Sequence, residues 1–261
     1  MDKIKTVIEK EWAEVFKNRI VLFTVAFLPL ILTALPLVTL AFMGDMGEGA
    51  VKGETPDEFF GALCVELSEV ECVQVFTLNL YTLMLMILPV AIPVTIAAYS
   101  IVGEKTAHSL EPLLATPITT LELVAGKTAA AAIPAVAATW LAYGLYVVGG
   151  RLLVNDAIFS HMIEPVWLIA IFAVSPLLTL MSVSVAIMVS SRASDPRMAE
   201  QLSAVVILPI ILLIAGQSVG YILLDQQLIL IIGAAVALLD IVLVYLSVRT
   251  FQRETILTRW K

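Results

Sequence analysis

Residues 75–102 read VFTLNLYTLMLMILPVAIPVTIAAYSIV, a run of 28 residues without a charged side chain. An apolar run of about 18 residues or more can cross the hydrocarbon core of a membrane as a helix. Backbone groups in lipid must hydrogen-bond within their own segment, so we expect a helix here. Five further blocks have the same character: 20–43, 128–148, 166–189, 202–224 and 228–248. The sequence therefore predicts an all-α polytopic membrane protein, one domain over residues 1–261 with six transmembrane helices.

The composition of the whole chain agrees with this prediction. Hydrophobic residues make up 60% of the sequence and charged residues 14%, whereas about a quarter of the residues of a soluble domain are charged. The chain therefore has too few polar residues to cover a water-exposed surface, and we expect the lipid bilayer around it. Its net charge of −7 is no sign of a nucleic-acid partner, because the distribution of charge matters more than the sum.

The basic residues are distributed unevenly among the segments that connect the blocks. Thirteen of the fifteen Lys and Arg residues lie before residue 20, in the loops 103–127 and 190–201, or after residue 248. The two exceptions are Lys52 and Arg151. Loops rich in Lys and Arg face the cytoplasm. Both termini are therefore predicted to be cytoplasmic. The membrane is expected to be a plasma membrane of the prokaryotic type.

Residues 1–19 form an amphipathic pattern before the first span. Ile8, Trp12 and Val15 recur with other apolar residues at three- and four-residue spacing, and charged residues mostly occupy the other positions. A basic amphipathic helix that carries a tryptophan is expected to lie in the membrane interface. The alternative is a simple topology anchor.

The outer loop, residues 44–74, is acidic, with eight carboxylates and one lysine. Thr55 and Pro56 start a short external helix in this interpretation. The carboxylates form either a solvated acidic face or a cation-collecting surface, but their spacing is no metal-loop pattern, and we predict no metal site. Cys64 and Cys72 are eight residues apart, so a disulfide between them needs a break in the helix, and two reduced thiols are the alternative.

Prolines interrupt five of the six predicted spans. Each removes a backbone hydrogen bond and tends to kink its helix. Kinked helices suit a protein that changes conformation, although static membrane bundles also tolerate them. The prolines are Pro29, Pro36, Pro89, Pro93, Pro134, Pro176 and Pro209.

The loop between the second and third spans, residues 103–127, reads GEKTAHSLEPLLATPITTLELVAGK. A short apolar face is followed by a break at Thr116-Pro117, because a residue before proline avoids the helical region. Thr119 and Glu122 then have the spacing of a capping box, which predicts a new helix that continues into the third span. A short helix with a defined break at the cytoplasmic surface can transmit force to or from a soluble partner.

This loop resembles that of the permease subunits of ABC-type exporters of the type-2 family. The matching residues are Glu104, Leu110, Glu111, Leu113, Leu114, Ala115, Thr116, Pro117, Glu122, Gly126 and Lys127. Two further stretches resemble the family in the same order, one from Ser191 to Leu202 and one from Phe251 to Glu254. One departure is Ala107-His108, where the family has a charged residue and a glycine.

The resemblance implies a permease that works by alternating access. Two permease chains, as a homodimer or heterodimer, are each expected to dock on one of two copies of an ABC ATPase subunit, which binds the ATP. The implied coupling residues are Glu104, Leu110, Glu111, Leu113, Leu114, Thr116, Pro117, Glu122 and Lys127. In the family the N-terminal helix also contacts the ATPase, which extends the prediction to Ile8, Trp12 and Val15.

Two sequence patterns suggest chemistry in this chain itself. Residues 124–128, VAGKT, end like a phosphate-binding loop, but Leu121 stands where the first glycine is required. Residues 216–220, GQSVG, match a nucleophile pattern, and an intramembrane serine hydrolase using Ser218 and His161 is an alternative function. Small residues in an apolar helix more often mark close packing. A membrane anchor that transports nothing is a third alternative.

Asp240 is the one ionisable residue deep within a predicted span. Such residues usually face the bundle interior or a cavity, so Asp240 is a transport-pathway candidate, with Asn79 the next. The alternative is that Asp240 only fixes helix packing through a polar partner. So few internal charges favour an amphipathic or lipid-like substrate. Residues 216–225 are either the end of a straight span or a re-entrant turn.

Overall fold

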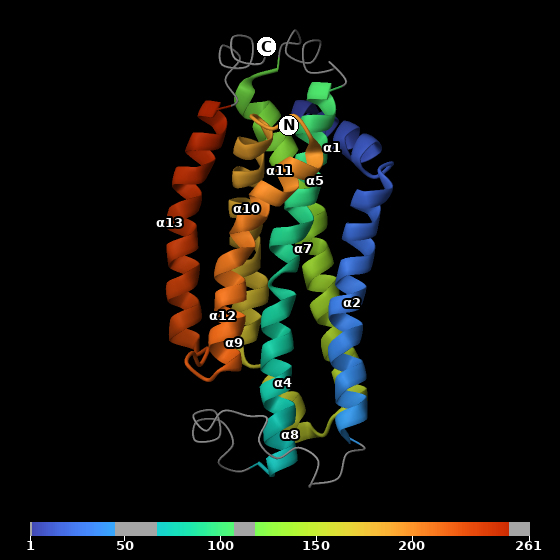
Figure 1. Ribbon diagram of the computed structural model, residues 1–261, viewed down its shortest axis with the longest axis vertical. Coiled ribbons are helices and arrows are strands. Elements are labelled where there is room, and N and C mark those ends of the chain that lie inside the picture. The colour runs from blue at the N-terminus through green and yellow to red at the C-terminus, as the bar shows by residue number, and fades with distance from the viewer. Residues whose placement is uncertain (1, 45–66, 107–117, 251–261) are drawn as a thin grey trace.

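The protein is a bundle of long helices in the computed structural model, which describes residues 2–44, 67–106 and 118–250 (Figure 1). These residues form helices and contain no strand. The helices are α1 (Asp2–Val15), α2 (Arg19–Gly44), α4 (Glu69–Leu85), α5 (Leu88–Thr106), α7 (Thr120–Leu153), α8 (Asp156–Met162), α9 (Pro165–Ile169), η1 (Ala170–Val174), α10 (Ser175–Ser190), α11 (Pro196–Ser203), η2 (Ala204–Ile207), α12 (Leu208–Ser218) and α13 (Gln226–Thr250).

Six helical segments within the described residues are long and apolar enough to cross a membrane. They are Arg19–Met43, Val70–Thr106, Thr120–Leu153, Asp156–Ser190, Pro196–Ser218 and Gln226–Thr250. Each contains or overlaps one of the blocks predicted from the sequence. The predicted all-α architecture with six long apolar helices is confirmed.

The helices alternate in direction, so the bundle has two ends (Figure 1). Where α5 ends at Thr106 and α7 begins at Thr120, α1 and α11 lie beside them, and we call this the α1 end. At the opposite end, which we call the α8 end, α2 finishes at Gly44 and α4 begins. Because α13 runs back to the α1 end, α1 and the C-terminal end of α13 lie at the same end of the bundle.

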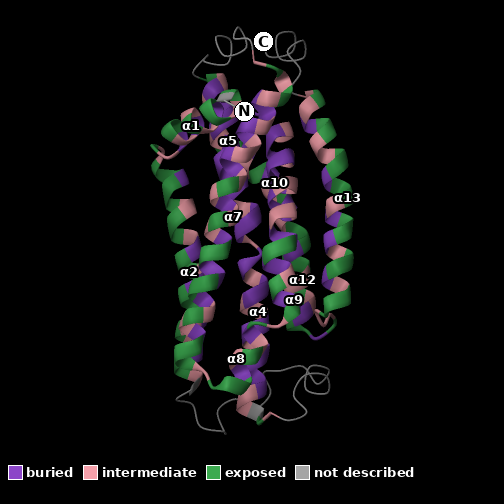
Figure 2. Ribbon diagram, turned by 180° about the vertical axis from the view of Figure 1, so that it is seen from behind, coloured by how far each residue is buried: buried purple, intermediate pink, exposed green. Residues whose placement is uncertain are grey.

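The span formed by α4 and α5 is the centre of the bundle. Its most apolar stretch is 83% buried, whereas the corresponding stretches of the first, fifth and sixth spans are 22% buried. Figure 2 shows the buried residues concentrated on the inner helices, with exposed stripes along α2 and α13. The exposed residues of α2 include Leu22, Phe23 and Phe42, which fits a helix whose outer face contacts lipid.

Three of the seven span prolines coincide with interruptions of the helices. Pro89 follows the turn at Met86–Ile87 between α4 and α5, Pro176 follows the π-helical η1, and Pro209 follows the 3₁₀-helical η2. Proline lacks the N–H that an α-helix needs, so the preceding turn adopts another hydrogen-bonding pattern. The other prolines lie inside the continuous helices α2, α5 and α7.

The helix before the first span ends earlier than the predicted segment 1–19. It stops at Val15, and Asn18 begins the next helix by accepting a hydrogen bond of 2.9 Å from the backbone of Ile20. Asparagine is a favoured N-cap because its side chain satisfies a free backbone N–H. The chain therefore has a defined joint between α1 and α2.

The fifth span ends at Ser218, six residues before the predicted 224. Gly220 has a φ of 86°, a conformation that glycine adopts without strain and that ends helices. Residues 219–225 then connect directly to α13 and contain no helix. The alternative of a straight span through residue 225 is therefore wrong, because the helix ends in a turn.

Several sequence predictions fall on residues outside the described part of the chain. These are the external helix at Thr55 and Pro56, Cys64, the coupling residues Leu110, Glu111, Leu113, Leu114, Thr116 and Pro117, and the Phe251–Glu254 stretch. Cys72 is described, and it is fully buried and disulfide-bonded.

Candidate functional site

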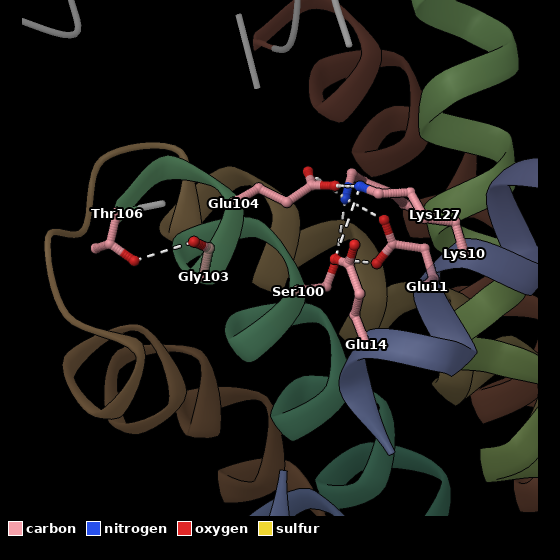
Figure 3. Close-up of polar contacts among 8 residues, drawn as sticks. All are labelled: Lys10, Glu11, Glu14, Ser100, Gly103, Glu104, Thr106 and Lys127. Carbon is pink, nitrogen blue, oxygen red and sulfur yellow. Dashed lines mark hydrogen bonds and ion pairs between the residues drawn. The ribbon is translucent and has the colours of Figure 1, made fainter. Parts of the chain in front are cut away.

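A buried lysine, Lys127 of α7, lies at the centre of a charged cluster between three helices (Figure 3). Its Nζ lies 2.6 Å from Glu11 Oε1 on α1 and 2.7 Å from Glu104 Oε2 on α5. It also donates a hydrogen bond of 3.0 Å to Ser100 Oγ on α5. The side chains of the lysine and both glutamates are each 3% exposed, so solvent does not screen these contacts.

A second lysine completes the cluster from α1. Lys10 forms an ion pair with Glu104, and the Ser100 hydroxyl donates a hydrogen bond to Glu11. Two ammonium groups therefore face two carboxylates, and the cluster has no net charge. We call the five residues that make these contacts the α1 clamp: Lys10, Glu11, Ser100, Glu104 and Lys127.

The pKa of Lys10 is set by opposing effects. Partial burial lowers this pKa. The hydrogen bond and the charge of Glu104, together with the charges of Glu11 and Glu14, raise it by more than burial lowers it, so the pKa lies above the usual 10.5. A raised pKa means that Lys10 is charged throughout the physiological range. Its contribution to stability is complete below its unfolded-state pKa and is lost as the pH rises through the folded-state pKa.

Close packing between α1 and α7 accompanies the charges. A Cβ atom on Gly126 would lie 2.7 Å from Val7 Cγ1, closer than two carbon atoms can approach, so the glycine is what allows α1 to lie against α7. One turn further along α7, the Trp12 Nε1 donates a hydrogen bond of 2.9 Å to the Ala130 carbonyl. The α1 helix is therefore held by shape as well as by charge.

The α1 clamp lies beside the ends of two helices. Glu104 is two residues from the end of α5, and Lys127 is about two turns from the start of α7. These two ends flank residues 107–117. The clamp thus fastens α1 to the last turn of α5 and to the beginning of α7.

The start of α7 is fixed by the predicted capping box. Thr119 N donates to Glu122 Oε2 at 2.8 Å, and Glu122 N donates to Thr119 Oγ1 at 3.2 Å. Lys3 Nζ of α1 lies 3.7 Å from Glu122 Oε2. The prediction of a helix start at this position is confirmed.

The structure brings several predicted residues together. Glu104 and Lys127 pair directly, and Glu122 lies at the same end of the bundle. In α1, Val15 is buried, and Ile8 and Trp12 are half-buried between α1 and its neighbours. The helix therefore packs on α7 in addition to any contact with the membrane interface.

The two pathway candidates have different surroundings. Asn79 of α4 is buried, and its Oδ1 accepts a hydrogen bond of 2.9 Å from Trp167 Nε1. Asp240 lies on the buried face of α13, 4% exposed, and neither carboxylate oxygen hydrogen-bonds to another described residue. A polar partner that fixes helix packing, the alternative for Asp240, is therefore not present among the described residues.

The nucleophile pattern at residues 216–220 forms the end of α12. Gly216 makes room for Ile222, since an added Cβ would lie 2.6 Å from Ile222 Cδ1. The Ser218 hydroxyl donates to the Ala215 carbonyl at 2.8 Å, and the His161 ring is hydrogen-bonded to Glu164. Each of the two proposed hydrolase residues thus has another partner, and of the two glycines Gly216 allows close packing while Gly220 ends the helix.

The pattern at residues 124–128 lies inside α7, where no loop can surround a phosphate. Lys127, which would contact the phosphate, is buried against two glutamates. Within the described residues, no group of three or more His, Cys, Asp or Glu side chains converges as a metal site.

Sequence reasoning missed Glu11, Ser100 and Lys10 as members of the cluster. For Glu11 a signal was present, because it lies four residues from both Val7 and Val15 and therefore belongs to the apolar face of its helix. A carboxylate on a buried face requires a cationic partner. Nothing in the spacing identifies Lys127 as that partner, 116 residues away.

The chain is thus a multi-span helical membrane protein, and the α1 clamp is a buried cluster of ion pairs at one end of its helical bundle. Comparison with protein families matches residues 5–253 to the family described as ABC-2 family transporter protein. The chain belongs to this family and is an ABC transporter permease, typically the non-catalytic membrane subunit, which generally works with an ATPase partner. A search of curated proteins gives no match.

Proposed function

We propose that this chain is the permease subunit of an ABC exporter and moves its substrate by alternating access. The ATP is bound and hydrolysed by a separate ATPase subunit, present in two copies. A second permease chain, identical or different, completes the transporter. Family membership supports this proposal, and so does the α1 clamp, which lies close to the two helix ends that flank residues 107–117 in the sequence.

The α1 end is the cytoplasmic end in this proposal. The unequal distribution of Lys and Arg supports this orientation, because these residues concentrate in segments at that end. The membrane is then a plasma membrane of the prokaryotic type. An ATPase in the cytoplasm meets α1, residues 107–117 and the start of α7 on one face.

Coupling works through the segment between α5 and α7. Leu110, Leu113 and Leu114 seat it in a groove of the ATPase, Glu111 supplies a polar contact, and Thr116-Pro117 provides the break. Closure of the two ATPase subunits pulls on this segment. Because the α1 clamp fastens α5 and α7 to α1, all three helix ends move together, and the interruptions at Pro89, Pro176 and Pro209 let the remainder of each span tilt.

The substrate is an amphipathic or lipid-like molecule in this proposal. Ionisable groups are rare in the spans, which disfavours a pathway for strongly charged compounds. Asp240 is the first pathway candidate because its carboxylate oxygens have no hydrogen-bond partner among the described residues. Asn79 is the second, although its hydrogen bond to Trp167 gives it a structural role as well.

The test is capture of the ATPase by the purified permease. Leu113→Asp with Leu114→Asp introduces two charges into the apolar face that docks, so the expected result is loss of ATPase binding in a pull-down. Leu152→Asp is the matched control, because Leu152 is 82% exposed at the α8 end and should not affect docking. Equal capture by the double variant and the unchanged chain contradicts the docking assignment.

A further inference from the structure

A groove opens at the α1 end on the side of the bundle away from α1. It has a volume of about 370 Å³ and is formed by α10, the turn after it, α11 and the end of α13. Its wall is mostly apolar, with one permanent cation. The lining residues are Met188, Val189, Arg192, Ala193, Met198, Leu202 and Thr250.

The charge at this groove is unbalanced. Arg192 lines it, and Arg197 and Arg249 directly precede the lining residues Met198 and Thr250. All three arginines are exposed, and none forms an ion pair with another described residue. An arginine beside apolar surface is suited to bind a phosphate, because its planar fork makes two hydrogen bonds.

The two acidic residues of the same segment form no ion pair with the arginines. Glu200 Oε1 accepts a hydrogen bond of 2.5 Å from Thr95 on α5. Asp195 Oδ1 accepts one of 2.6 Å from the backbone N–H of Arg197 and so caps α11. Both carboxylates keep their negative charge in these contacts, but neither forms an ion pair with Arg192, the one charged residue of the groove lining.

The groove is also continuous with surface that contacts lipid. Leu202 is 57% exposed, and Val205 and Leu208, which follow on the same span, are 55% and 53% exposed. Tyr245 and Leu246 of α13 are exposed near the same end. An acyl chain can therefore run along apolar side chains while its headgroup lies at the arginine.

We infer that this groove binds the phosphate headgroup of an anionic phospholipid of the inner leaflet. Basic pockets between transmembrane helices on the cytoplasmic side are known to hold such headgroups. The assignment rests on the cytoplasmic orientation of the α1 end proposed above, but on no property of the ATPase or the transport cycle. A lipid bound here contacts the turn at Ala193, whose carbonyl accepts a 3.0 Å hydrogen bond from Lys105 of α5.

The test is photolabelling of the purified full chain in nanodiscs, without ATPase. Phosphatidylglycerol and phosphatidylcholine probes, each with a diazirine on the acyl chain, are compared in otherwise identical bilayers. One arginine–phosphate contact near the membrane surface corresponds to about fivefold in binding. Labelling of residues 188–202 by the anionic probe should therefore exceed that by the zwitterionic probe about fivefold.

The variants assign the effect to the groove. Arg192→Gln should reduce anionic labelling to the level of phosphatidylcholine, and Arg192→Lys should retain most of it. Arg19→Gln is the matched control: it removes one exposed charge at the same end but outside the groove, and should leave the labelling unchanged. Because Arg192 is exposed and unpaired among the described residues, these variants should fold, which their unfolding midpoints will show.

Three outcomes would overturn the inference. Equal labelling by the two probes would mean that the groove holds only ordinary boundary lipid. Unchanged labelling in Arg192→Gln would show that Arg192 does not bind the headgroup. Full competition by soluble glycerol phosphate would make the groove a site for soluble anions. Failure of the unchanged chain to capture an ATPase would contradict the proposed function. It would not affect the lipid assignment, because the photolabelling uses no ATPase.

Discussion

At the scale of single residues, Lys127 has the most demanding surroundings in the described part of the chain. Its ammonium group is buried and satisfied by two carboxylates and a hydroxyl from two other helices. Burying charges costs several kcal/mol each, and pairing repays this only when the geometry is good. We therefore expect the α1 clamp to fix the alignment of α1, α5 and α7, and removal of one partner to cost more stability than the net contribution of the intact cluster.

Replacing Lys127 by methionine tests this alignment. Lys127→Met leaves the buried Glu11 and Glu104 facing each other without their shared cation, so the free energy of unfolding should fall by about 3 kcal/mol. The measurement is reversible unfolding of the purified protein in mixed micelles.

The control for this variant is Lys17→Met, which removes an exposed lysine just beyond α1 and should cost less than about 0.5 kcal/mol. Adding Glu104→Gln to Lys127→Met should recover part of the loss. Equal stability of the two lysine variants would show that the buried ion pairs do not hold α1.

Two glycines of α7 form a matched pair for testing the packing. Gly126→Ala places a Cβ 2.7 Å from Val7 Cγ1, whereas Gly144→Ala meets nothing within 4 Å. The first should destabilise by about 1–3 kcal/mol through overpacking, and the second should be neutral or stabilising by up to about 1 kcal/mol. The same unfolding measurement, with proteolysis of α1 as a second readout, distinguishes them. Similar losses in both variants would refute the close approach of α1 to α7.

At the scale of elements, two spans begin with the same capping box at opposite ends of the bundle. Ser68 and Glu71 cap α4 at the α8 end, and Thr119 and Glu122 cap α7 at the α1 end. Both satisfy backbone N–H groups that would otherwise be free. The two boxes have the same internal hydrogen bonds. Comparing variants of the two boxes therefore separates an effect of lost stability from an effect of position in the molecule.

Replacing the N-cap residue of each box by alanine tests whether the box of α7 has a role in coupling. Ser68→Ala and Thr119→Ala should each cost about 1 kcal/mol of stability. Substrate-stimulated ATPase activity of the reconstituted transporter should fall only with Thr119→Ala, because its box orients the segment proposed to contact the ATPase. Matching activity losses in the two variants would indicate that α7 has no special place in coupling.

At the scale of the whole molecule, the six spans place α1 and the end of α13 on one side. The inner span, α4 with α5, is surrounded by the others, and the exposed faces of α2 and α13 are apolar along their length. Such a bundle buries its polar contacts near the centre and at the α1 end. The proposed orientation of this bundle in the membrane rests on the distribution of Lys and Arg among its loops, and it can be measured directly.

Cysteine labelling in intact cells measures this orientation. Lys17→Cys at the α1 end and Ser160→Cys in α8 are both exposed positions. A membrane-impermeant maleimide should label Ser160→Cys in intact cells and Lys17→Cys only after the membrane is opened. Labelling is compared with the unchanged chain, which accounts for the native cysteines. The reverse pattern would invert the topology and contradict the assignment of the groove to a lipid of the inner leaflet.

Much of the architecture was predictable because it depends on local composition. Membrane spans follow from long apolar runs, and the start of α7 follows from Thr119 and Glu122 in one turn of helix. The early end of the fifth span at Ser218 was harder to predict, since Val219 to Leu224 are as apolar as a span requires. There, the backbone conformation of Gly220 decided the boundary.

The sequence by itself determined the class of the protein: six apolar blocks, their helical form, and the basic bias of one set of loops. Only the tertiary structure decided that Glu11, Ser100, Glu104 and Lys127 meet, and that Gly126 exists to let Val7 approach. Hydrophobicity and capping are properties of neighbouring residues, so they are visible along the chain. A buried ion pair between residues more than 100 positions apart depends on how the helices pack, and no local pattern encodes it.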